Sequence, residues 1–165
     1  MLIVFDREST LLRYMVGYLK ALLRDWPDEQ LLTPITGAAN PPAFTVGHLA
    51  MSLDLALQLL GQPTQCPASW HTAFGPEADP KNVVLPYPSK SEFLARIESG
   101  LEAVVIAAKS ADAAAMAGPQ QFKFFVGTPI QTVGDCVALL MTTHFSIHVG
   151  QLSVMRRVCG KPPLF

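Results

Sequence analysis

Proline placement is the feature of this sequence that most constrains its fold. A proline fixes φ and lacks a backbone N–H, so it interrupts the interior of a helix or of a central strand. Most of the 14 prolines gather in residues 26–42, in residues 62–90, between 119 and 129, and near the C-terminal end. Long regular elements are therefore confined to the stretches between these connections. The connection over 62–90 is long, and connections of that length are often functional.

The stretches between the prolines predict four helices, because apolar residues recur there at spacings of three and four. The predicted helices cover residues 6–25, residues 45–61, a segment that begins at residue 89, and residues 132–159. No stretch alternates convincingly as a strand would, so the pattern favours an all-α helical bundle in a single domain, residues 1–165. On the first helix we expect one apolar face of Leu11, Met15, Tyr18, Leu19 and Leu22.

Capping residues mark where the later helices should begin. Thr45 is the expected N-cap of the second helix. Ser89 and Glu92 form a capping-box pattern at the start of the third. Thr132 and Asp135 have the same spacing, with aspartate as the acidic partner, at the start of the fourth.

Composition and charge exclude several classes of partner. Half of the residues are apolar, 15% are charged, and the formal net charge is -1. Because no run of Lys or Arg stands out, we expect neither nucleic acid nor an anionic membrane as a partner. The opening "MLIVFDR" lacks the features of a signal peptide, and no uninterrupted apolar run approaches the ~18 residues of a transmembrane helix. Three scattered cysteines indicate free thiols, so we predict a cytoplasmic protein.

Two of the four histidines lie four residues apart on the apolar face of the last predicted helix. His144 and His148 continue the stripe of Val137, Met141 and Leu152. Residues at this spacing have neighbouring Cβ atoms, so two imidazoles can converge on one metal ion. The H-E-x-x-H pattern of zinc proteases requires a glutamate after the first histidine, whereas Phe145 stands there.

His48, near the start of the second predicted helix, would complete a three-histidine site with open positions for water or substrate. The alternative is that these histidines are hydrogen-bonded core residues without a metal. A bundle that binds haem through two imidazoles is a more remote alternative. The position of His71 in the proline-rich connection favours a solvated or locally hydrogen-bonded side chain over a fourth metal ligand.

Two further polar positions are candidates for supporting roles. Gln151 follows His148 by three residues and could orient a ligand imidazole or a bound water, or could equally be an amide on the bundle surface. Arg156 and Arg157 could hold a carboxylate, although the helix dipole also favours cations in a last turn.

The histidine segments "TVGHLA" and "HFSIHVGQLSVMRRVCGKP" together resemble the DinB-like superfamily, including its YfiT-type members. The family pattern is an early-helix histidine, then H-x-x-x-H-x-G-Q in the last long helix, a basic residue and a Gly-x-Pro ending. The matching residues here are His48, His144, His148, Gly150, Gln151, Arg156, Arg157, Gly160 and Pro162.

The resemblance implies a four-helix bundle with up-down-down-up connections, which suits the long loops. It implies a divalent ion, commonly nickel, zinc or iron, held by His48, His144 and His148. It also implies a homodimer. Characterised relatives include thiol-dependent enzymes: S-transferases that use bacillithiol or mycothiol, and a mycothiol-dependent maleylpyruvate isomerase. Many relatives have no known activity.

These observations predict a metal-dependent enzyme that acts on a small molecule. A Lewis acid with an open position lowers the pKa of a bound water or thiol. Thiol S-transfer, with a low-molecular-weight thiol as co-substrate, and hydrolysis both fit that chemistry. The alternative is a helical bundle that binds a metal or a small ligand without catalysis.

Overall fold

The computed structural model describes residues 5–38, 40–80 and 86–164, and within them the fold is all-α, as the sequence predicts. The only extended pairing among the described residues is an isolated bridge between Pro119 and Thr132. Residues 1–4 of the opening segment lie outside the described part. The long helical segments are α1 (Asp6–Leu23), α3 (Pro42–Leu59), α5 (Lys90–Lys109), and a last run of α7 (Val133–Leu139), η2 (Leu140–His144) and α8 (Phe145–Val158).

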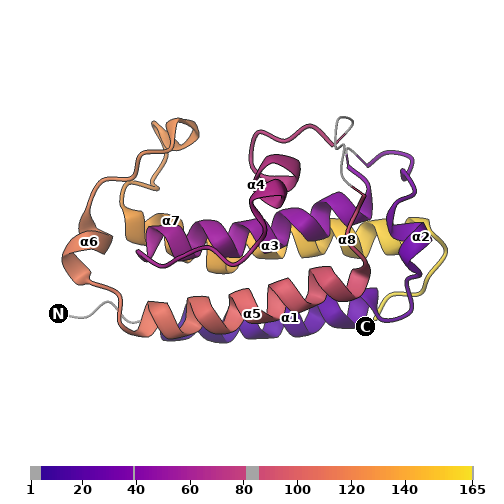
Figure 1. The fold of residues 1–165 in the computed structure, drawn as a ribbon, viewed down its shortest axis with the longest axis horizontal. Coiled ribbons are helices and arrows are strands. Elements are labelled where there is room, and N and C mark those ends of the chain that lie inside the picture. The colour runs from indigo at the N-terminus through magenta and orange to yellow at the C-terminus, as the bar shows by residue number, and fades with distance from the viewer. Residues whose placement is uncertain (1–4, 39, 81–85, 165) are drawn as a thin grey trace.

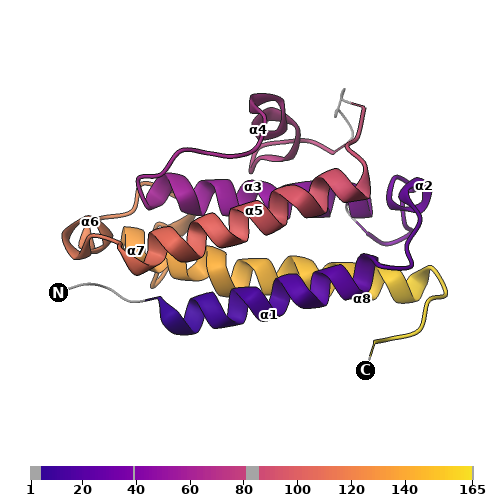
Figure 2. The same cartoon turned by 60° about the horizontal axis from the view of Figure 1, so that its bottom comes forward.

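The four long segments pack side by side around one apolar core (Figure 1). Helix α3 packs against α5 and α8, and α1 packs against the same two neighbours. Figure 2 shows α5 and α8 between α3 and α1. The largest fully buried side chains include Trp26, Phe74, Phe93 and Phe145. Burial of such aromatic side chains contributes roughly 1.5–3 kcal/mol each.

The caps of α5 and α7 are confirmed, because Ser89 with Glu92 and Thr132 with Asp135 each form a complete capping box. The predicted N-cap of the second helix was wrong. Helix α3 begins three residues earlier, with Pro42 in its first turn, and Thr45 is buried inside it. Proline is well suited to the first helical position, where its missing N–H has no partner to lose.

The predicted apolar face of the first helix is confirmed only in part. Leu19 and Leu22 are fully buried, but Leu11 is 52% exposed, and Leu12, Val16 and Leu23 complete the buried face. Both sets have helical spacing, so periodicity alone could not choose between two adjacent stripes.

The last helical run contains a π-helical turn, η2, that the sequence gave no reason to expect. Such turns insert an extra residue into an α-helix and are frequent at functional sites. His144 is the last residue of this turn, and His148 follows in α8.

Shorter elements lie in the connections: α2 (Asp28–Leu31), α4 (Ala68–Phe74), α6 (Ala113–Ala117) and η1 (Lys123–Phe125). Helix α4 is regular structure within the proline-rich connection over residues 62–90. The segment "FKFFV", residues 122–126, has the 3-10 turn η1 at its centre. In Figure 1, α4 and the segment that carries η1 both rise above the α3 side of the long helices.

By length and composition alone, Val133–Val158 is long and apolar enough to cross a membrane, with a mean hydropathy of 1.2. The search of the sequence for uninterrupted apolar runs did not flag this segment, because polar residues are interspersed in it. The finding is weak evidence for a span, since core helices pass the same test.

Candidate metal centre

His48 faces the last helical run from the second turn of α3 and is held by a contact with α4. Its Nδ1 lies 2.8 Å from the carbonyl oxygen of Phe74 and is placed to donate to it. Phe74 can approach α3 because residue 47 is glycine, and its ring lies where a Cβ of residue 47 would be. The contact fixes the tautomer of His48, which leaves its Nε2 with a free lone pair.

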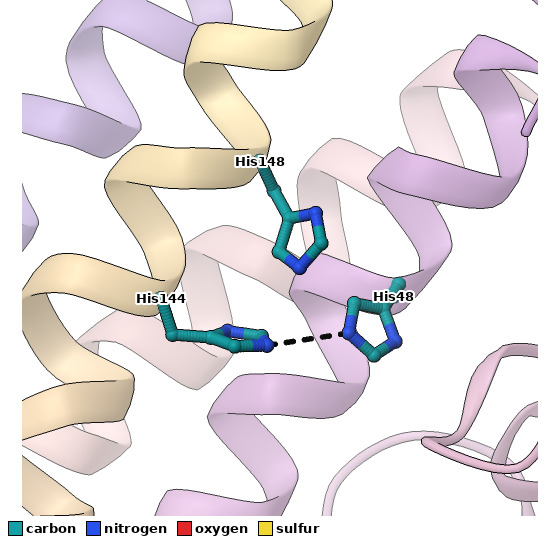
Figure 3. Close-up of side chains that lie close together, drawn as sticks. All are labelled: His48, His144 and His148. Carbon is teal, nitrogen blue, oxygen red and sulfur yellow. Dashed lines mark hydrogen bonds between the residues drawn. The ribbon is translucent and has the colours of Figure 1, made fainter. Parts of the chain in front are cut away.

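His144 and His148 enter from the last helical run, on the side that faces α3 (Figure 3). The Nδ1 of His148 lies 2.8 Å from Oε1 of Gln151, one turn further along α8. An N–H donated to this amide oxygen leaves the Nε2 of His148 free to accept or to ligate. Gln151 therefore contacts a histidine of the cluster, although its side chain is exposed.

The three histidines form a compact cluster. One ring nitrogen of each lies within 4.8 Å of the others, and all three side chains are partly buried. The Nε2 atoms of His48 and His144 are 3.3 Å apart. Two nitrogens bound tetrahedrally at 2.0–2.1 Å to one zinc ion would lie about 3.3–3.4 Å apart, so the spacing fits a shared ion.

Neither neutral tautomer of His144 satisfies both of its ring nitrogens in the free cluster. Its Nδ1 is buried and has no hydrogen-bond partner among the described residues. If Nε2 carries the proton, it can donate to Nε2 of His48, and Nδ1 is a buried acceptor without a partner. If Nδ1 carries the proton, it is an unsatisfied donor, and the lone pairs of two Nε2 atoms face each other at 3.3 Å. Either state carries a cost, and a cation among the three rings removes the lone-pair repulsion of the second.

Burial keeps all three imidazoles neutral, which is the form that ligates metals. Desolvation lowers the pKa of His48, and the bond to Phe74 opposes that shift only in part. For His144, desolvation and then the neighbouring histidines lower the pKa to about 3. Desolvation also lowers the pKa of His148, against the opposing effect of Gln151.

A cavity of about 390 Å³ opens beside His48 and His144. This volume is within the range of small-molecule sites, about 300–1,000 Å³. Its wall combines α3 and the last helical run with the segment around η1, and it is mostly apolar. Sequence reasoning missed this wall and the carbonyl of Phe74, since nothing in a local pattern shows that these connections fold back over α3.

His71 and Arg156 do not join the histidine cluster. His71 lines the cavity, and its Nε2 lies 3.2 Å from a carboxylate oxygen of Asp54. Asp54 is buried and also accepts from the backbone N–H groups of Gln65 and Cys66. Arg156 is buried, forms an ion pair with Asp25, and donates to the carbonyl oxygens of Leu22 in α1 and Pro162 after α8. Its guanidinium thus holds the ends of two helices together.

Comparison with known proteins identifies one family. A family model described as the DinB superfamily matches residues 12–152, which includes the cluster histidines and Gln151. No curated protein matches the sequence.

Proposed function

Because this chain belongs to the DinB superfamily, we propose that it is a divalent-metal-dependent enzyme acting on a small molecule. His48, His144 and His148 would hold the ion. The observation that carries the proposal is their convergence, with the Nε2 atoms of His48 and His144 at the separation a shared ion requires. Nickel, zinc and iron all accept imidazole ligands.

The supporting contacts prepare the ligands for this role. Phe74 and Gln151 accept from the outer nitrogens of His48 and His148, which aims their inner nitrogens at one point. Partners of this kind orient ligands and raise their basicity. No carboxylate or thiol joins the three histidines among the described residues, so positions of the ion would stay open.

The bound ion would supply a Lewis acid that lowers the pKa of a thiol or a water. We propose thiol S-transfer or hydrolysis as the reaction, with a low-molecular-weight thiol as co-substrate in the first case. Among the described lining residues outside the cluster, the one imidazole is that of His71, beside the buried Asp54. The absence of a glutamate beside His144 argues against zinc-protease chemistry. The alternative remains a bundle that binds a metal without turnover.

We also propose the up-down-down-up connection of the family for the four long segments. In Figures 1 and 2 the chain runs one way along α1 and α8 and the opposite way along α3 and α5. A cytoplasmic location, a single domain and a homodimer remain proposals of the same kind. Analytical ultracentrifugation decides the last.

Elemental analysis of untagged protein tests the metal site. We expect about one divalent ion per chain, retained after gel filtration. The ion should be lost in His144→Ala and retained in His71→Ala, which removes a histidine outside the cluster. Circular dichroism should show that both variants keep their helicity.

Two results would count against the proposal. Protein that stays metal-free after incubation with nickel, zinc and iron(II) would leave the histidines as core residues. Loaded protein that turns over no thiol or ester substrate would leave a binding protein without catalysis.

A further inference from the structure

The cavity beside the histidines indicates what kind of molecule the site accepts. Resting on the metal function above, we propose that the substrate is a neutral molecule with an apolar body that reaches from the three histidines to the phenylalanine cluster of Phe122, Phe124 and Phe125. The reacting group would lie at the histidines, and the apolar body would lie in the cavity.

The cavity lining combines two kinds of chemistry. His48 and His144 belong to it, so a metal-binding group in the cavity can reach the ion. The remaining wall is largely aliphatic and aromatic, and includes Met51, Leu55, Leu139, Leu140 and the phenylalanine cluster. An apolar wall of this kind gains free energy by removing apolar ligand surface from water.

The loop that carries the phenylalanine cluster is closed at its base by backbone hydrogen bonds. The N–H of Gln120 donates to the carbonyl of Gln131 at 3.0 Å, and the N–H of Val133 donates to the carbonyl of Gly118 at 2.9 Å. Inside this loop the ring centroids of Phe124 and Phe125 are 4.4 Å apart.

The exposure of these rings points to a ligand. Phe124 is 63% exposed although it lines the cavity. Phe122 and Phe125 beside it are partly buried, and contiguous apolar surface of this kind marks ligand-binding grooves as well as protein and membrane interfaces. A bound apolar molecule would cover the ring surface that now faces the cavity.

Charge selects against ionic ligands. The cavity lining contains no Lys, Arg, Asp or Glu among the described residues. Its polar side chains are Ser52, Gln58, Cys136 and histidines, and burial raises the pKa of the Cys136 thiol, which keeps it neutral. An ionic group in the apolar part would lose its hydration without gaining an ion pair. A neutral body is therefore the better fit.

A homologous series of alkyl hydroxamic acids tests the proposal, because the head binds zinc and the tail varies. We would measure affinity for the zinc-loaded protein by calorimetry for two-, four- and six-carbon chains. Affinity should rise about fourfold for each added methylene. A six-carbon chain ending in a carboxylate should bind roughly tenfold or more weakly than its methyl-ended equivalent.

Two variants of one loop provide the matched control. Phe124→Ala removes a ring that lines the cavity, whereas Val126→Ala shortens a neighbouring side chain that is 79% exposed and does not line it. Phe124→Ala should flatten the dependence on chain length, and Val126→Ala should leave it unchanged. Because both residues are exposed, neither variant should unfold the protein.

Binding of a neutral fluorescent probe, N-phenyl-1-naphthylamine, to the metal-free protein separates this proposal from the metal function. If zinc binds but the affinity for hydroxamates does not depend on chain length, the proposed substrate class is wrong and the metal site stands. The same conclusion follows if the carboxylate-ended chain binds as tightly as the methyl-ended one. If no zinc binds, the metal function fails. Probe binding weakened by Phe124→Ala and not by Val126→Ala would then still support the apolar site, and equal binding to both variants would overturn it.

Discussion

Gly47 precedes His48 in α3, and the ring of Phe74 rests directly on it. A Cβ at this position would lie 2.6 Å from Cγ and 2.7 Å from Cδ1 of that ring. The ring cannot turn away to solvent, because Phe74 is fully buried and packs against Phe44, Trp70, Tyr87 and Phe93. In Gly47→Ala, α4 therefore has to move by about 1 Å to restore an ordinary carbon–carbon contact of about 3.5–4.0 Å.

The expected cost of Gly47→Ala combines two opposing effects. Overpacking a core costs roughly 1–3 kcal/mol, whereas alanine in place of glycine inside a helix gains about 0.5–1 kcal/mol. Gly17→Ala isolates the second effect, because Gly17 lies within α1 and nothing lies within 4 Å of its added Cβ. The difference in unfolding free energy between the two variants should thus be roughly 1–3 kcal/mol.

Urea unfolding followed by circular dichroism measures that difference, and thermal unfolding should show it as about 2–4 °C per kcal/mol. Displacing the Phe74 carbonyl would also weaken the 2.8 Å bond to His48. Metal affinity in Gly47→Ala should therefore fall about 10–100-fold, with no histidine altered. If Gly47→Ala were as stable as Gly17→Ala and bound metal like the natural protein, the role assigned to this glycine would be wrong.

Three further predictions concern single side chains. Gln151→Ala should weaken metal binding about 10–100-fold while stability changes by less than about 0.5 kcal/mol, because Gln151 is exposed; unchanged affinity in a competitive chelator titration would contradict its contact with His148. The bond to Arg156 lowers the pKa of Asp25 to about 2 from 3.8, so the ion pair stabilises the protein above pH ~4 and is lost as the pH falls towards 2. The difference in urea stability between the natural protein and Asp25→Asn should accordingly shrink over that range, and a constant difference would refute the assignment. Cys159 is exposed whereas the other two thiols are buried, so a thiol reagent should label one fast-reacting site that disappears in Cys159→Ser.

Some features of the fold could be predicted from local chemistry. Proline positions separated the four long helices, and the capping boxes at Ser89 and Thr132 placed two of their starts correctly. The first helix shows the limit of such patterns. Its two adjacent stripes both suit a helix, and only contact with α5 and α8 decides that Leu12 is buried and Leu11 is not.

The candidate site divides in the same way. The spacing of His144 and His148, and the short motifs around them and His48, are properties of the sequence, since residues four apart on a helix share a face. Whether His48 meets the other two depends on how α3 packs against the last helical run, since His48 and His144 are 96 positions apart in the sequence. Three features of the site could not be predicted from the sequence and are known only from the tertiary structure: the Phe74 carbonyl, the π-helical turn and the phenylalanine cluster. The Phe74 carbonyl and the phenylalanine cluster reach the site because connections fold back onto helices distant in sequence, and no local periodicity records which connection meets which helix.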